Sequence, residues 1–199
     1  MENHPRTLLP TPTGTPTRLA VALIHCLTYD LSKTEKGNQY LKMAFTNWGV
    51  IYMREIKKVG IDKKGTISLQ NLIDIVKDNS NIQKSGAIAT FTGIVRGVTH
   101  EGKEVDKLEL EAYDEMADKD LTKICDELRN KPGIVDVLIH HLTGTFSVGE
   151  DMVYVVVAGA SRKDVFQTLI EAVERYKHET TIWKKEYLKD GTSHWITVD

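Results

Sequence analysis

Cysteine is scarce in this chain of 199 residues, which has only Cys26 and Cys125, and neither belongs to a Cys-x-x-Cys pair. This scarcity argues against a disulfide scaffold and against a structural zinc site, and it favours a reducing cytoplasm as the location. The chain also has no large excess of charge of either sign, because its formal net charge is only -2. We therefore expect no nucleic-acid partner, and any anion binding must come from a local cluster of basic residues.

Long hydrophobic runs are also absent. The longest, residues 19–27, is too short to span a bilayer. It follows a segment rich in proline and threonine rather than a basic one, and no small-residue cleavage site comes after it, so we expect neither a membrane segment nor a signal peptide. The phosphate-binding loop GxxxxGK[ST] does not occur, which leaves phosphate-loop chemistry without support.

Proline is confined almost entirely to the start of the chain, where four of the five prolines lie within the first sixteen residues. Residues 1–18 are therefore predicted to be a disordered tail. Residues 19–65 form an extension of unknown role, whose apolar run fits a strand or a helix segment equally well. Later in the extension the pattern of residues 34–53 predicts a helix that stops at Gly49 and then a short strand. Residues 60–65 are typical of a turn.

Regular patterns continue from Ser68, a suitable N-cap for a helix whose apolar residues recur at three-to-four spacing. The remaining patterns predict helices over residues 115–129 and 162–178, and strands over residues 85–97, 105–113, 134–141 and 152–159. The last of these strands is apolar enough to be central in a sheet, and Asp190–Gly191 favours a hairpin over residues 185–198. This irregular order predicts an α+β domain over residues 66–199.

The final predicted helix ends in a basic residue. Phe166, Leu169, Ile170 and Val173 form an apolar stripe, and Lys177 continues the same face. Desolvation there lowers the pKa of an ammonium group unless an anion compensates, so Lys177 is a candidate acid, base or anion-binding group. The alternative is a lysine that extends to water and is favoured at a helix C-terminus by the macrodipole.

Two arginines are further candidates for anion binding. Arg162 opens the last helix, where its guanidinium and free backbone N–H groups suit a phosphate or a carboxylate, and Arg96 ends an apolar strand. For both, the alternative is a surface arginine without a partner. Cys125 lies on an apolar helical face and fits the core better than a nucleophile. His140 and His141 point to opposite faces of a strand, so they cannot bind one metal together, and we expect one of them to be a satisfied structural histidine.

Three segments of the chain resemble the large, catalytic subunit of molybdopterin synthase. They are GAIATFTGIVRG (residues 86–97), HLTGTFSVGEDMVYVVVAGASRKDVF (residues 141–166), and YKHETTIWKKE (residues 176–186) followed by DGTSHWI. They occur in the order and spacing of that family, over residues from about 68 to 199. The resemblance implies an α/β-hammerhead-type fold with an antiparallel C-terminal hairpin. It also implies a homodimer of large subunits, each holding a small ubiquitin-like subunit, so that the assembly is a heterotetramer.

The resemblance implies a reaction as well. Two sulfurs would pass from the thiocarboxylated C-terminal Gly-Gly of the small subunit to cyclic pyranopterin monophosphate, giving the dithiolene of molybdopterin. Such a chain would be a cytoplasmic sulfurtransferase of molybdenum cofactor biosynthesis, with no permanently bound cofactor and no metal site. This agrees with the residue pattern, because a phosphorylated substrate requires a cationic site and sulfur carried by a partner makes a local cysteine unnecessary.

Site residues follow from the resemblance position by position. Lys177 and Lys184 match the two lysines taken as essential in the family. Lys177 is then the acid, base or transient covalent group at the reacting carbon, and Lys184 orients the thiocarboxylate or neutralises the developing oxyanion. Arg96 and Arg162 match arginines thought to bind the pterin and its phosphate. Two further assignments are Phe91, as an aromatic contact of the partner tail, and Lys185, as added positive charge beside Lys184.

One position departs from the family pattern. Ser161 stands before Arg162 where the family commonly has histidine. A serine can bind a phosphate by hydrogen bonds, but it does not take up a proton near neutral pH as histidine does. The alternatives to an active sulfurtransferase are a docking module for a ubiquitin-like tail that has lost catalysis, and a different anion-binding transferase on the same scaffold.

Overall fold

The structure is a computed structural model that describes residues 39–45 and 51–196, with side chains described from Lys57 onward. The described residues fall into two units, one that includes residues 41–45 and 51–55, and one that includes residues 39–40 and 56–196. Strands β1 (Gln39–Phe45) and β2 (Ile51–Lys57) form a two-stranded sheet that belongs mainly to the smaller unit. The predicted tail of residues 1–18 and the apolar run of residues 19–27 lie outside the described residues.

The two-stranded sheet corrects one prediction and confirms another. A helix was expected before Gly49, but residues 39–45 form strand β1, because pairing with β2 overrides the helix propensity of residues such as Leu41 and Met43. The strand expected after Gly49 is confirmed by β2. The turn predicted for residues 60–65 begins later than expected, since its first four residues form a strand.

The larger unit has the α+β composition that the sequence predicted. Its helices are α2 (Leu69–Lys77), α3 (Asp114–Arg129) and α4 (Arg162–Glu179), with a short 3-10 helix at Ile82–Lys84. Its strands are β3 (Gly60–Lys63), β4 (Ala87–Ile94), β5 (Val105–Ala112), β6 (Ile134–Ser147), β7 (Asp151–Gly159), β8 (Ile182–Leu188) and β9 (Ser193–Ile196). Ser68 caps α2 as expected, since its side chain accepts a hydrogen bond from the backbone N–H of Asn71.

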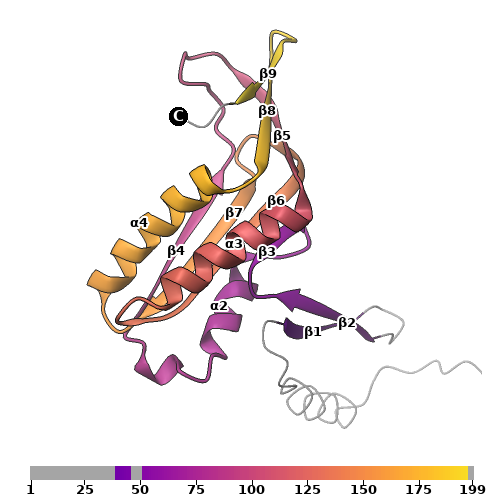
Figure 1. Cartoon of the computed structure of the whole chain (residues 1–199). Helices are drawn as coiled ribbons and strands as arrows, with labels where there is room; N and C mark the ends of the chain where they lie inside the picture. The colour runs from indigo at the N-terminus through magenta and orange to yellow at the C-terminus, as the bar shows by residue number, and fades with distance from the viewer. Residues whose placement is uncertain (1–38, 46–50, 197–199) are drawn as a thin grey trace, which may run out of the picture. The chain divides into compact units, whose positions relative to one another are not determined.

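These seven strands form one sheet in the order β4-β7-β6-β5-β8-β9, whose neighbours are all antiparallel, with β3 added alongside β6 in parallel (Figure 1). Strand β7 lies between β4 and β6, which confirms its predicted central position. Strand β6 is longer than predicted. Its residues 134–141 pair with β7, whereas residues 144–147 pair with β5. One strand therefore belongs to both halves of the sheet.

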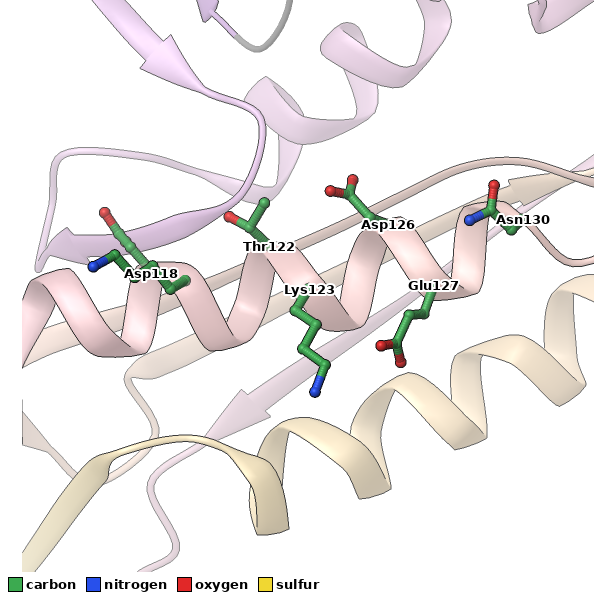
Figure 2. A pocket seen from close by; sticks show the side chains of 7 residues that line it. Asp118, Thr122, Lys123, Asp126, Glu127 and Asn130 are labelled. Carbon is green, nitrogen blue, oxygen red and sulfur yellow. The ribbon is translucent and has the colours of Figure 1, made fainter.

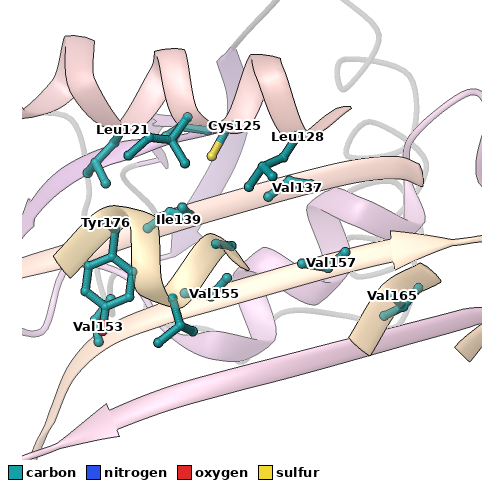
Figure 3. Close-up of a cluster of buried hydrophobic side chains, with 14 residues drawn as sticks. Leu121, Cys125, Leu128, Val137, Ile139, Val153, Val155, Val157, Val165 and Tyr176 are labelled. Carbon is teal, nitrogen blue, oxygen red and sulfur yellow. The ribbon is translucent and has the colours of Figure 1, made fainter. Parts of the chain in front are cut away.

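Helices cover both faces of the half of the sheet that is formed by β4, β7 and the first part of β6. α3 and α4 lie side by side on one face (Figure 1), and α2 packs on the other. Strand alternation sends Val137 and Ile139 of β6 toward α3 and α4, and sends Leu138 and Leu142 toward α2. Figure 3 shows the cluster beneath α3 and α4, where valines of β7 meet side chains of both helices.

The buried face of α4 differs from the predicted stripe. Phe166 and Ile170 are 56% and 65% exposed. Val173 of the predicted stripe is buried and Leu169 packs against the core cluster. The other residues of the packed face are Val165, Thr168, Ala172 and Tyr176. The sequence holds two overlapping apolar stripes, and the sheet selects the one that begins with the smaller Val165. Within the described residues, no helix is both long and apolar enough to cross a membrane.

Candidate functional site

Lys177 and Lys184 line the same cavity, which has a volume of about 760 Å³. Lys177 lies near the end of α4, and Lys184 comes from β8, the strand that follows this helix. The loop between β4 and β5 contributes Arg96, and β9 contributes His194. The two lysines that the sequence singled out are therefore neighbours in space, although a helix end and a turn separate them along the chain.

Strand alternation explains which residues of β8 reach the cavity. Lys184, Glu186 and Leu188 share one face of the strand and all line the cavity. The opposing residues of the hairpin, Ile196 and His194, pair with Lys184 and Glu186 and line it as well. The cavity is thus built on one face of the β8–β9 hairpin.

The loop of residues 95–104 completes the wall. The backbone N–H of Thr99 donates to the carbonyl of Lys103, which folds the loop back on itself. The guanidinium Nη2 of Arg96 lies 3.1 Å from Nε2 of His100. Because a guanidinium can only donate, Nε2 of His100 is the acceptor in this contact.

Electrostatics in the cavity favour an anionic ligand. Burial and the positive charge of Lys177 lower the pKa of Lys184 below its ordinary value. Of the two carboxylates that line the cavity, Glu186 lies 3.4 Å from Nε2 of His194. The lining carries four basic side chains, Arg96, Lys103, Lys177 and Lys184, against two carboxylates, Glu101 and Glu186. An anion between Lys177 and Lys184 would relieve their mutual repulsion.

The exposure of Lys177 differs from what the sequence predicted. Lys177 was predicted to lie on the buried stripe of the helix, but its side chain is exposed and lines the cavity. The buried residue at this end of α4 is Tyr176, one position earlier. The lysine is therefore accessible to a ligand entering from solvent, while Lys184 is half-buried.

Two other predicted site residues lie away from the cavity. Phe91 of β4 is half-buried, stands opposite Val155 of β7, and packs against the core cluster beneath α3 and α4. Lys185 lies on the opposite face of β8 from Lys184, with its Nζ 5.2 Å from the ring centroid of Tyr187 and 5.5 Å from that of Trp195. It therefore adds no charge beside Lys184 within this chain.

Ser161 and Arg162 lie at the other end of α4. Fifteen residues separate Arg162 from Lys177, which corresponds to about 22 Å along the helix axis. The Ser161 hydroxyl donates to the Asp164 carboxylate at 2.7 Å and caps the helix by accepting from the Asp164 N–H. A single copy of the chain does not bring Arg162 and Ser161 to the cavity that holds Lys177.

The adjacent histidines of β6 have opposite environments. His140 is satisfied, with Nδ1 2.7 Å from a carboxylate oxygen of Asp62 and Nε2 2.9 Å from the carbonyl of Lys58, which confirms one structural histidine. His141 is fully buried, and its Nε2 has no hydrogen-bond partner. Burial, together with the charge of Lys184, lowers the pKa of His141 to about 3.

Sequence reasoning missed three histidines near the site. His100 and His194 line the cavity, and the charge of Lys184 acts on His141. A signal existed for His141, because it shares the parity of Ile139 and Val137 and so faces the last helix. The positions of His100 and His194 depend on a loop fold and a hairpin register that the residue pattern does not specify.

Thiol and metal chemistry have little support in the described residues. Burial raises the pKa of Cys125 to about 12, which keeps the thiol protonated and agrees with its predicted place in the core. Within residues 57–196, no three histidine, cysteine, aspartate or glutamate side chains are grouped so that they could hold a metal ion.

A second hollow of about 530 Å³ runs along the outer surface of α3 (Figure 2). One helix supplies its whole lining: Asp118, Lys119, Thr122, Lys123, Asp126, Glu127 and Asn130. Charges of both signs occur there, three acidic and two basic, and Asp118 is already bound by Lys57 and by the backbone N–H of Ile61. This surface lacks the excess of positive charge that distinguishes the first cavity.

Comparison with known proteins gives a consistent family. The sequence profile of the MoaE protein family matches residues 62–179. The molybdopterin synthase catalytic subunit of Pyrococcus abyssi is 36% identical over 143 residues, which cover 71% of this chain and 93% of that protein. The probable molybdopterin synthase of Haloferax volcanii is 37% identical over 131 residues, which cover 65% of this chain but only 50% of that protein.

Solved structures agree with these relatives. The crystal structure of molybdopterin synthase from Staphylococcus aureus is 34% identical and matches with a TM-score of 0.63, over 71% of this chain and 98% of that one. A complex of subunits 1 and 2 of the molybdopterin-converting factor from Helicobacter pylori has the same fold, with a TM-score of 0.56 at 20% identity, over 70% of this chain and 90% of that one. The chain therefore belongs to the MoaE protein family, which includes catalytic subunits of molybdopterin synthase.

Proposed function

We propose that the cavity shared by Lys177 and Lys184 is the site where sulfur is transferred to cyclic pyranopterin monophosphate. The sulfur would come from the thiocarboxylated C-terminal Gly-Gly of a small ubiquitin-like subunit, and the product would be molybdopterin. The observation that carries the proposal is the shared cavity itself, with Arg96 on its wall. A phosphate ester and a thiocarboxylate are both anions, and both need the positive charge found there.

The two lysines suit different steps of this reaction. Lys177 lies exposed at the rim, where it can reach the reacting carbon of an entering substrate as an acid, a base or a transient covalent group. Lys184 is half-buried, and burial strengthens its interaction with any anion that replaces the lost water. It would neutralise the thiocarboxylate and the oxyanion that develops when the thioacid carbon is attacked.

Arg162 requires a second copy of the chain in this proposal. It lies about 22 Å along α4 from the cavity of its own chain. In a homodimer the N-terminal end of α4 from one copy can reach the cavity of the other and bring its guanidinium to the substrate phosphate. Ser161 would then serve Arg162 by capping the same helix end, a role that its hydrogen bonds with Asp164 already support.

The test is molybdopterin formation in a reconstituted assay with thiocarboxylated small subunit. We expect Lys177→Ala to reduce product formation on the order of 100-fold or more, because it removes a group at the reacting atoms. Lys77→Ala is the matched control, since Lys77 is also an exposed lysine at the end of a helix but does not line the cavity. A fully active Lys177→Ala variant would refute the role of Lys177.

The docking-module alternative is separated by measuring binding and turnover together. If the wild-type chain binds the thiocarboxylated tail but gives no product, the chain is a docking module and the sulfurtransferase proposal fails. If both binding and product occur, the departure from the family pattern at Ser161 has not removed catalysis.

A further inference from the structure

The unpaired Nε2 of His141 is the starting point. The Nδ1 atom lies 3.1 Å from the carbonyl oxygen of Leu142. A carbonyl can only accept, so Nδ1 carries the proton and Nε2 presents a lone pair. Among the described side chains, this is the only buried nitrogen or oxygen atom without a hydrogen-bond partner. Buried acceptors are rarely left unpaired, because each loses its bond to water without replacement.

The ring of His141 is held firmly in this position. The aromatic ring of Tyr176 packs edge-on against it, with ring centroids 6.0 Å apart. Tyr176 comes directly before Lys177 on α4, so His141 lies beneath the end of the helix that forms the cavity rim. The lone pair is therefore fixed in direction by the sheet, by the Leu142 carbonyl and by the helix.

His141 has an acceptor that lacks a donor, whereas Lys184 carries hydrogen-bond donors that lack an acceptor among the described residues. Its ammonium is desolvated and repelled by Lys177, and no acidic side chain among the described residues offsets these effects. It lies close enough to His141 for its charge to act on the imidazole. An ammonium group has three N–H donors on a flexible four-carbon stem, which can turn toward a fixed acceptor.

We propose that His141 is a positioning residue for Lys184, and that its Nε2, which has no partner in this structure, accepts a hydrogen bond from the Lys184 ammonium when that flexible side chain turns toward it. This bond would hold the ammonium of Lys184 away from Lys177. When a thiocarboxylate or phosphate enters, it would compete for the same N–H groups and draw Lys184 toward it. Without this anchor, the ammonium would be desolvated with nothing to bind.

Other groups around Lys184 set the electrostatic background. Lys177 disfavours its ammonium form, and burial raises the pKa of Tyr176, so that the phenol stays neutral. The remaining charged or titratable groups of the cavity are Arg96, His100, Glu101 and Lys103 on the loop, Glu186 on β8 and His194 on β9. These groups are unchanged in variants of His141, so a difference between such variants reports on position 141.

The test is the rate at which acetic anhydride acylates Lys184 in the free protein between pH 6 and 9, followed by mass spectrometry of the peptides. Only the neutral amine reacts. His141→Leu removes the acceptor, so we expect Lys184 to react faster, on the order of tenfold at a given pH. His141→Gln places an amide oxygen near the position of Nε2 and should restore the wild-type rate. Lys185, on the opposite face of the same strand, is the internal control and should react equally in all three proteins.

Equal rates for Lys184 in all three proteins would overturn the proposal. The proposal also fails if His141→Leu leaves the acylation rate of Lys184 unchanged but makes the chain more resistant to urea. That result would show that Nε2 of His141 is a buried acceptor that binds nothing in the wild-type chain. Should His141→Leu fail to fold, ¹⁵N NMR of the histidines provides the second measurement. We expect Lys184→Met to move the Nε2 resonance of His141 downfield, as expected for a lone pair that has lost its donor. An unmoved resonance contradicts the proposal.

The inference rests on the proposed function only for its meaning in catalysis. Acylation and NMR use the free chain without substrate or small subunit, so they can succeed even if sulfur transfer fails. In the reconstituted assay, a positioning role predicts that His141→Leu shifts the pH profile of product formation to lower pH and that His141→Gln restores it. A purely structural role would lower the rate at every pH without moving the profile.

Discussion

The two faces of strand β8 show how one short sequence produces two environments. Lys184 and Lys185 are neighbours in the chain, yet one lines the cavity and the other lies on the opposite face. The cavity face withdraws the ammonium of Lys184 from water beside another cation. The opposite face places the ammonium of Lys185 against the rings of Tyr187 and Trp195, which attract a cation. A dense run of lysines thus combines one position that lines the candidate site with one that packs on the aromatic rings of the hairpin.

The largest expected effect tests this comparison directly. Lys184→Ala should reduce molybdopterin formation on the order of a thousandfold, because in the proposed function it removes the charge that would stabilise the developing oxyanion. Lys185→Ala should change the rate by about twofold or less, since its charge lies on the solvent side. The measurement is initial rate with saturating thiocarboxylated small subunit. Equal losses in the two variants would contradict the division between the faces.

The buried side of the site also predicts a pH dependence of stability. The pKa of His141 is about 3 in the folded chain, against an ordinary value of 6.5. Between these values the unfolded chain binds the proton and the folded chain does not, so stability falls as the pH falls from 6.5 toward 3. The loss from this residue alone is at most about 5 kcal/mol.

Urea unfolding at a series of pH values measures this effect. In His141→Leu the free energy of unfolding should fall less steeply over the same range. His100→Leu is the control, because His100 is exposed and its removal should leave the slope nearly unchanged. A slope that is equally steep without His141 would show that another group causes the acid sensitivity.

A charge reversal on each face gives a smaller effect. Arg96→Glu should raise the KM for the phosphorylated substrate about tenfold while leaving affinity for the small subunit nearly unchanged, because Arg96 lines the cavity. Lys107→Glu makes the same change of charge on the exposed side, where Lys107 lies 4.8 Å from the ring of Tyr187. We expect its KM to stay within about twofold of wild type. Losses of both substrate and partner binding in Arg96→Glu would indicate misfolding instead.

The smallest effect concerns the aromatic side of the hairpin. Trp195 is 51% exposed, and its ring interacts with Lys185. Trp195→Ala should lower the free energy of unfolding by about 0.5 to 1 kcal/mol, as expected for an exposed cation–π contact. The rate of product formation at a temperature well below the unfolding transition should not change. A large loss of activity in this variant would show that the solvent face takes part in the reaction.

The elements most visible in the sequence were those with a single clear period. The alternation of Leu108 and Leu110 located β5, and the valines of residues 153–157 located the central β7. The stripe on α4 was right at Leu169 and Val173 but wrong at Phe166 and Ile170, because periodicity does not say which of two overlapping apolar faces meets the sheet. Strand β3 failed because Gly60 and Asp62 are typical of turns, while a parallel partner and the His140–Asp62 contact hold them extended.

The candidate site could be predicted only in part, because the sequence pattern does not specify the register of the hairpin or the packing around His141. The resemblance named Lys177 and Lys184, and the structure places both in one cavity. It could not show that Lys185 points away from Lys184, because the hairpin was expected to begin at Lys185 rather than at Ile182. The unpaired nitrogen of His141 depends on the packing of Tyr176 and on a backbone carbonyl, which no one-dimensional pattern contains.

The division of β6 between the two halves of the sheet has a consequence for the order in which the molecule unfolds. The cavity hairpin joins the helix-covered half by main-chain pairing through β5, which meets β6 only at residues 144–147. That junction begins at Gly144, whose φ of 125° is strained for any residue with a side chain. Mild denaturant should therefore fray β8 and β9 first, so that amide hydrogens there exchange while those of β7 stay protected. The protein would lose its catalytic capacity as a separate, earlier event than the collapse of its scaffold.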